Sequence, residues 1–215
     1  MNPKHVPEPR WPSALALIAV GALHYSMPSY LIPGPDWLLA SFVVIVVIIS
    51  LVAHAQGFAT LAQVGGLVAN SLVTIGLIAS TSLLIIGLAS RREDPKQLLL
   101  AALAIWSSNI LVFASWYWRL DAGGPHAREA SETHTRGAFL FPQMAIDPVL
   151  REQLGFIYWR PRFIDYLFVA FNTSTAFSPT DVPVLSRWAK PMMMVQSSVS
   201  LGTLAILAAR AINIL

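Results

Sequence analysis

The distribution of charge along this chain restricts its fold more than any other feature. Between Arg10 and Arg91 the only formally charged side chain is Asp36, and the segments 97–118 and 191–209 carry no charge at all. Crossing a bilayer requires about 20 predominantly apolar residues, and these stretches are long enough. The sequence therefore predicts an all-α integral membrane protein with about five transmembrane helices.

Turn residues and charged clusters place the expected helices. The short turn Pro33-Gly34-Pro35 and the charged turn at 91–96 separate apolar stretches, because neither continues a helix well. The aromatic run Trp116-Tyr117-Trp118 ends one stretch and is typical of a belt at a membrane interface. The five expected spans are 12–31, 37–54, 64–89, 98–118 and 186–212.

Composition limits the chemistry that the chain can carry. It has no cysteine, which excludes disulfides, thiolate metal sites and cysteine nucleophiles. A formal charge of +3 is too small to indicate binding of nucleic acid, so the lipid bilayer is the expected partner. No nucleotide-binding loop, metalloprotease motif or catalytic triad is present, and we expect neither an enzyme nor a cofactor.

The segment before the last span has an unusual length. Phe163–Ala176 is apolar but covers only about 21 Å as a helix, short of the ~30 Å hydrocarbon core. The following residues, 177–183, contain two prolines and cannot form regular helix. Non-helical backbone at membrane depth requires protein or a water-filled cavity to satisfy its polar groups. The pattern predicts a re-entrant half-helix and loop before the last span.

The chain accordingly divides into two segments. Residues 1–97 form a three-helix membrane segment, and residues 98–215 form a channel-like segment. The parts of the second segment are an outer helix (98–118), an extramembrane loop (119–160), a half-helix with its loop (161–184) and an inner helix (186–212).

The run DYLFVAFNTSTAFSPTDVP, residues 165–183, resembles the pore helix and filter of two-helix, P-loop ion channels. In that family an aromatic-rich half-helix leads through threonines into Thr-Val-Gly-Tyr-Gly-Asp. The resemblance implies that Asp181 matches the family's aspartate and that 176–180 occupy the filter. It also implies a homo-oligomer, because one hairpin cannot enclose a pore.

The whole chain also resembles a group of bacterial integral membrane proteins of unassigned activity. The shared motifs are Trp116-Tyr117-Trp118, Gly123-Gly124-Pro125, the run FLFPQ at 139–143 and the run TAFSPTD at 175–181. This resemblance implies a multi-pass protein of the bacterial inner membrane.

The departures from the channel family exclude a potassium filter. Ser178 and Thr180 replace the glycines, and a left-handed conformation costs such residues about 1–2 kcal/mol. Pro179 fixes its own φ and restricts the residue before it. Any passing ion would be coordinated by hydroxyls or a carboxylate. The filter-like residues are Thr173, Thr175, Ala176, Phe177, Ser178, Pro179, Thr180 and Asp181. The alternative is a packing role, with hydroxyls bonded to nearby carbonyls and Asp181 capping a helix.

One face of the last helix is polar. Its residues recur at steps of four and three, so they share a face and predict a pore lining. They are Gln196, Ser200, Thr203, Leu207 and Arg210. The alternative is interhelical hydrogen bonding, with Arg210 extended to the interface.

The basic residues indicate an orientation. With a re-entrant hairpin, the N-terminus, the long loop and the turn at 187–190 share one side with ten Lys and Arg, against four on the other. The positive-inside rule places the ten in the cytoplasm, whereas P-loop channels present their filter outside. If 163–181 crosses fully, the division becomes nine to five.

Other candidate residues give the alternative functions. His126, Glu129, Glu132 and His134 have spacings compatible with zinc, but a solvated loop is the preferred interpretation. A non-conducting protein that binds a partner or lipid through 121–159 is the second hypothesis. A membrane-embedded transporter or enzyme that uses His24, Asp165 or Asp181 is the third.

Overall fold

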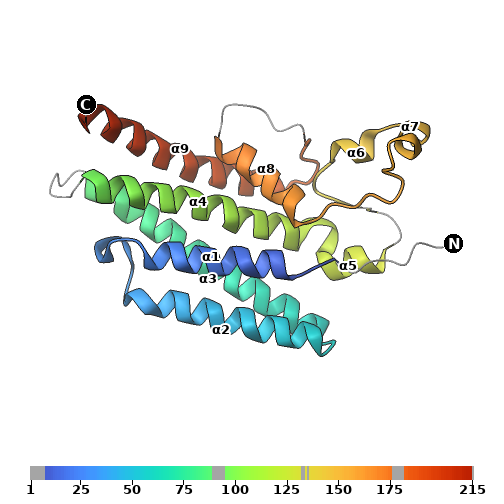
Figure 1. Ribbon diagram of the computed structural model, residues 1–215, viewed down its shortest axis with the longest axis horizontal. Helices are drawn as coiled ribbons and strands as arrows, with labels where there is room; N and C mark the ends of the chain where they lie inside the picture. Colours follow the sequence, from blue (N-terminus) through green and yellow to red (C-terminus); the bar gives the residue numbers. More distant parts are fainter. Residues whose placement is uncertain (1–7, 89–94, 132–133, 135, 176–181, 215) are drawn as a thin grey trace.

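The computed structural model describes residues 8–88, 95–131, 134, 136–175 and 182–214, and all regular elements among them are helices. The long helices lie side by side in an elongated bundle, and the short helices gather at one end (Figure 1). The helices are α1 (Trp11–Tyr25), α2 (Asp36–Ala55), α3 (Ala59–Leu88), α4 (Pro95–Leu120), α5 (Pro125–Ala130), α6 (Pro142–Ala145), α7 (Pro148–Gln153), α8 (Phe163–Thr175) and α9 (Ala189–Ile214). Two 3-10 turns, η1 (Ser29–Leu31) and η2 (Asp121–Gly123), complete the fold.

Four of the helices in the described residues are long and apolar enough to cross a membrane. They are α2, α3, α4 and α9. The outer face of α2 is exposed and aliphatic, with Ile45, Ile48 and Val52 each about half exposed. A face of this kind suits lipid around it, and together with the four long helices it agrees with the expected membrane-embedded class.

The first helix is shorter than the sequence predicts. α1 ends at Tyr25 after 15 residues, whereas the apolar pattern continues to Leu31. Pro28 has no N–H to donate to the carbonyl of His24 and disfavours helix at Met27. The residues after it form η1 instead, and α1 falls short of the length expected for a simple span.

The link between the second and third helices is also shorter than predicted. A Schellman motif ends α2: the N–H of Phe58 donates to Ala53 at 2.8 Å and that of Gly57 to His54 at 3.1 Å. Gly57 has the positive φ of 81° that this motif requires. α3 therefore begins at Ala59 rather than Val64.

The fourth helix, α4, which the sequence assigns to the second segment, contacts helices of both predicted segments. It packs against α1 and α3 on one side and against α8 and α9 on the other. One continuous hydrophobic core includes Leu17, Val73, Ile105 and Tyr166, which come from both segments. The sequence division at residue 97 therefore does not correspond to two separate cores in the described residues.

Candidate functional site

The short helix α8 lies along the second half of α4. At its start the rings of Phe163 and Trp118 are 6.1 Å apart, and near its end Trp106 donates from Nε1 to the Ser174 carbonyl at 3.3 Å. Trp118 and Trp106 are about 18 Å apart along α4 at 1.5 Å per residue. With 13 residues, α8 reaches from the C-terminal end of α4 to its middle.

From residue 182 the chain lies at the same end of the bundle as the start of α8. The N–H of Leu140 donates to Pro183 at 3.0 Å, and that of Leu185 donates to Ala138 at 2.8 Å. Phe139, between these bonds, has its ring 5.1 Å from that of Tyr117 in the last turns of α4. α8 and α9 consequently begin at the same end of the bundle (Figure 1).

A buried polar cluster joins α8, α9 and α4. Gln196 of α9 donates from Nε2 to the Ala170 carbonyl at 2.7 Å and to Ser174 Oγ at 2.8 Å, and its Oε1 accepts from the hydroxyl of Tyr117. Asn109 of α4 donates to the Gln196 carbonyl at 3.0 Å and to Ser200 Oγ at 2.9 Å. The cluster holds the half-length helix against both long helices.

The predicted pore-lining face of α9 contacts α4 and α8 of the same chain. Gln196, Ser200 and Thr203 have no exposed surface, and Leu207 is half-buried. Gln196 and Ser200 belong to the polar cluster, and Thr203 Oγ1 donates to the Val199 carbonyl of its own helix at 3.0 Å. The bonds of Gln196 and Ser200 join different helices, as in the alternative that the sequence left open, whereas the Thr203 bond stays within α9. Arg210 lies on α9, and its side chain is outside the description.

Two filter-like residues can be placed. Thr173 and Thr175 lie in the last turns of α8, where their hydroxyls donate to Val169 at 2.8 Å and Asn172 at 3.0 Å. Such bonds to preceding carbonyls are common for threonine in helices. The remaining filter-like residues, Ala176 to Asp181, lie outside the described residues.

Gln196 provides a test of the polar cluster. Gln196→Leu keeps the volume but leaves the Tyr117 hydroxyl, Ser174 Oγ and the Ala170 carbonyl without this partner. Unsatisfied buried groups cost about 1–3 kcal/mol each, so for these three groups we expect a loss of stability of at least about 3 kcal/mol. Thermal unfolding of the detergent-purified protein measures it. The control is Ser198→Ala, since Ser198 is exposed and bonds only to Met194. Equal stability of the two variants would contradict a structural role for the cluster.

The predicted aromatic belt is wrong for two of its three residues. Tyr117 and Trp118 are buried, and Trp116 donates from Nε1 to Thr74 Oγ1 at 2.8 Å. All three have partners within the protein, because α4 is surrounded by helices at this level. Phe139 and Phe141 of the long loop are buried beside them.

An ionic network that the sequence did not reveal anchors the long loop. Asp121 is fully buried and accepts from the Tyr166 hydroxyl at 2.6 Å and from the Ala138 N–H, and His134 Nε2 lies 2.9 Å from it. Nearby, Arg128 pairs with Glu8 at 3.0 Å. The partners are 13 to 120 residues apart, and no local motif in the sequence pairs them.

The remaining candidate residues do not converge on one site. His134 pairs with Asp121, whereas the ring of His126 lies 5.3 Å from that of His54. No cluster of three metal-ligating side chains occurs among the described residues. His24 is buried beside a small cavity, and Asp165 accepts the N–H of Arg162 at the start of α8.

The surroundings of His126 predict a pH dependence. Burial lowers the pKa of His126 below 6.5, Arg10 and His54 lower it further, and Glu129 opposes them. On acidification the unfolded chain takes up this proton first, so stability is lost as the pH falls from about 6.5 through the folded pKa. We expect the unfolding temperature to fall less between pH 7.5 and 5.5 in His126→Gln than in the wild type. If the unfolding temperatures of the variant and the wild type fell equally over this pH range, His126 would not be the source of the pH dependence.

No protein-family model, curated protein or solved structure matches this chain.

Proposed function

We propose that the C-terminal hairpin forms a permeation path between copies of this chain in a bacterial inner membrane. The observation that carries the proposal is the length and position of α8. It covers half of α4, and from residue 182 the described chain lies at the level where α8 starts, which supports a re-entrant element in this proposal. Such an element requires protein or water around its backbone.

The two helices of the hairpin, α8 and α9, have different roles in this proposal. The hydrogen bonds of Gln196 and Asn109 occupy the polar face of α9 inside one copy. In this proposal that face positions α8, and the permeating species meets the segment 176–181. Hydroxyls and the carboxylate of Asp181 would supply the coordination, because the segment lacks the glycines of a potassium filter.

Exposed apolar surface is available for assembly. Ile164, Phe168 and Phe171 of α8 are about half exposed or more, and so are Val195 and Leu201 of α9. These faces of the hairpin meet either lipid or another copy. Several copies around an axis would enclose the path that one hairpin cannot.

Planar-bilayer recording of purified protein tests the proposal. The cysteine-free chain permits single cysteines, and we expect Ser178→Cys and Thr180→Cys channels to be blocked by a charged thiol reagent. Ser200→Cys serves as the control, because Ser200 is fully buried and should not react. A monomer by native mass measurement, with no conductance under any ionic gradient, would refute permeation.

The long loop favours a second candidate function, binding at the membrane surface. Several apolar side chains of α7 and the residues after it are exposed although the rest of the loop is anchored. They are Val149, Leu150, Leu154, Ile157 and Tyr158. A peptide of residues 121–159 is expected to float with lipid vesicles in a density gradient, and the double substitution Leu150→Gln and Leu154→Gln should reduce the fraction that floats. An unchanged fraction would exclude this role.

A further inference from the structure

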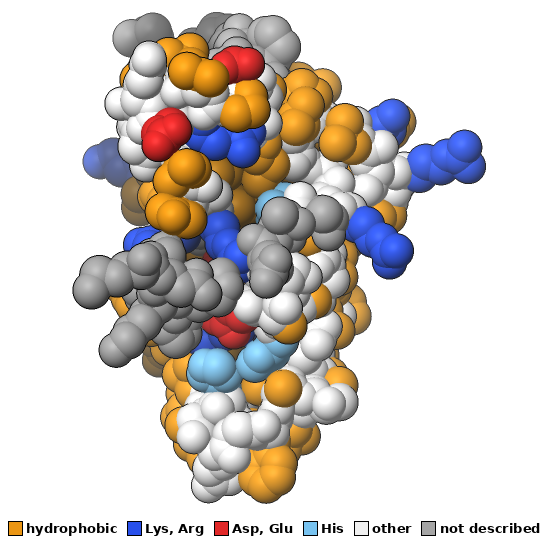
Figure 2. Space-filling model, turned by 90° about the vertical axis from the view of Figure 1, so that its right-hand side faces the viewer, with side chains coloured by type: hydrophobic (Ala, Val, Ile, Leu, Met, Phe, Trp, Pro, Cys, Tyr) orange, Lys and Arg blue, Asp and Glu red, His pale blue; other side chains and the backbone are white. Residues whose placement is uncertain are grey.

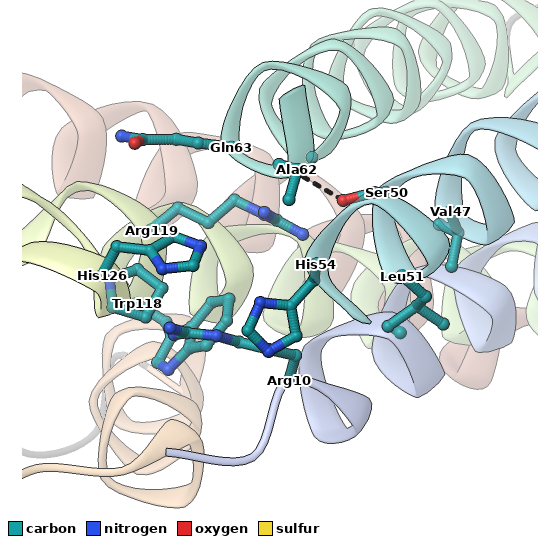
Figure 3. Close-up of a pocket in the computed structure, with 13 residues that line it drawn as sticks. Arg10, Val47, Ser50, Leu51, His54, Ala62, Gln63, Trp118, Arg119 and His126 are labelled. Atoms are coloured by element: carbon teal, nitrogen blue, oxygen red, sulfur yellow. Dashed lines mark hydrogen bonds between the residues drawn. The ribbon is translucent and has the colours of Figure 1, made fainter. Parts of the chain in front are cut away.

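A cavity with basic walls opens at the loop-bearing end of the bundle. It contains about 560 Å³ of space not filled by atoms, part of it open to the surroundings. Arg10, His54, Arg119 and His126 line it together with apolar residues of α2 and α3 (Figure 3). We call it the basic cavity. Figure 2 shows this end of the molecule, where Lys, Arg and His side chains lie on the surface among apolar and some acidic ones.

Arg119 is the unusual residue of the basic cavity. Within the described part of the chain, its Nε is buried without a hydrogen-bond partner, and its Nη2 makes a long contact of 3.4 Å with Ser13 Oγ. The guanidinium lies 5.4 Å from the centre of the Trp118 ring. No ion pair involves Arg119 among the described residues. A buried cation without a counterion is destabilising.

Unlike Arg119, the neighbouring arginines are paired with acidic side chains. Arg10 pairs with Glu129 at 2.8 Å and Arg128 pairs with Glu8 at 3.0 Å. These acids are already engaged, and no Asp or Glu occurs among the residues that line the basic cavity. The cavity therefore has an excess of positive charge.

A glycine of α3 makes room for the guanidinium. A Cβ at Gly66 would lie 1.7 Å from Arg119 Nη1 and 2.3 Å from Cζ. The helix dipole favours a cation in the last turn of α4. It does not account for a side chain that extends across to the backbone of another helix and into a cavity (Figure 3).

The position of the basic cavity indicates the depth of its ligand. It lies where α2 ends and α3 begins, at the limit of two helices long enough to cross a membrane. Leu51 lines it and is 36% exposed, and Ile48 and Val52 continue the exposed apolar face of α2. At this depth a bilayer presents phosphate groups, with acyl chains alongside the helix.

We propose that the basic cavity binds a negatively charged phosphate group, carried by a lipid headgroup or present as a soluble ion. Guanidinium N–H groups form charge-assisted, forked hydrogen bonds with phosphate oxygens. The ligand supplies the counterion that Arg119 lacks. This site is independent of the proposed permeation path, because α8 and α9 contribute no residue to the basic cavity.

Binding can be measured on the full chain purified in detergent. We expect phosphatidylglycerol to raise the unfolding temperature saturably, and phosphatidylcholine, whose headgroup has no net charge, to have little effect. A separate titration with inorganic phosphate, against chloride at equal ionic strength, distinguishes a soluble ion from a lipid. Saturable protection by either phosphate source supports the site.

Two variants assign the binding to this cavity. Arg119→Gln should bind at least about tenfold more weakly, as expected for the loss of a hydrogen bond to a charged group. Gly66→Ala keeps every charge and displaces the guanidinium, so it should also weaken binding. Arg187→Gln removes an exposed charge and should not. Equal loss in Arg119→Gln and Arg187→Gln would overturn the proposal, as would equal protection of the wild type by both lipids.

Discussion

Asp121→Ala is expected to reduce the stability of the protein by about 3–5 kcal/mol, the usual effect of removing one member of a buried charged network. The substitution leaves the Tyr166 hydroxyl and the Ala138 N–H without their acceptor and His134 without its carboxylate. Because Tyr166 belongs to α8 and Ala138 to the long loop, both should loosen together. Thermal unfolding and limited proteolysis of the loop would record the two effects.

The matched control is Asp147→Ala. Asp147 is exposed and caps α7 through a 2.9 Å bond from the Val149 N–H. Loss of such a cap costs about 1 kcal/mol. If the two aspartates had equal effects, Asp121 would not be the anchor that the geometry indicates.

Phe139→Ala is expected to have a loss of similar size, about 3–5 kcal/mol, because it opens a large cavity in a packed core. The ring of Phe139 is 1% exposed and lies within 6.4 Å of the rings of Tyr117, Tyr166 and Trp188. These residues belong to α4, α8 and the segment before α9, so one ring holds the base of the hairpin together. Chemical or thermal unfolding measures the change.

Phe168→Ala supplies the comparison, since Phe168 lies on α8 but is 55% exposed. In detergent, Phe168→Ala should reduce the free energy of unfolding much less than Phe139→Ala does. We also expect Phe139→Ala to disturb any conductance, because Phe139 contacts both ends of the hairpin. A Phe139→Ala protein with unchanged stability would contradict this packing.

The sequence predicted the features that depend on length and composition alone. Charge-free stretches identified the long helices, since a bilayer excludes unpaired charge whatever the helices contact. The short length of Phe163–Ala176 agrees with the 13 residues of α8. Pro28 and Gly57 shifted the end of α1 and the start of α3 through local backbone chemistry that the apolar pattern does not register.

Tertiary structure decided where each helical face points. The spacing of Gln196, Ser200 and Thr203 correctly placed them on one face, but a shared face does not reveal its neighbour. In a membrane protein, apolar residues face both lipid and protein, so hydrophobicity does not separate the outside of a helix from its inside. For this reason Tyr117 and Trp118 could be mistaken for a lipid-facing belt.

The charged residues illustrate the same limit at the loop-bearing end. The sequence established that many basic residues gather there, which is a statement about topology. Only the fold paired Arg10 and Arg128 with acids more than a hundred positions away and left Arg119 against Gly66 without one. The sequence by itself determined that the chain is a membrane protein with a half-length helix before its last span. The tertiary structure decided which polar groups are satisfied within the chain, because that depends on contacts between residues far apart in sequence.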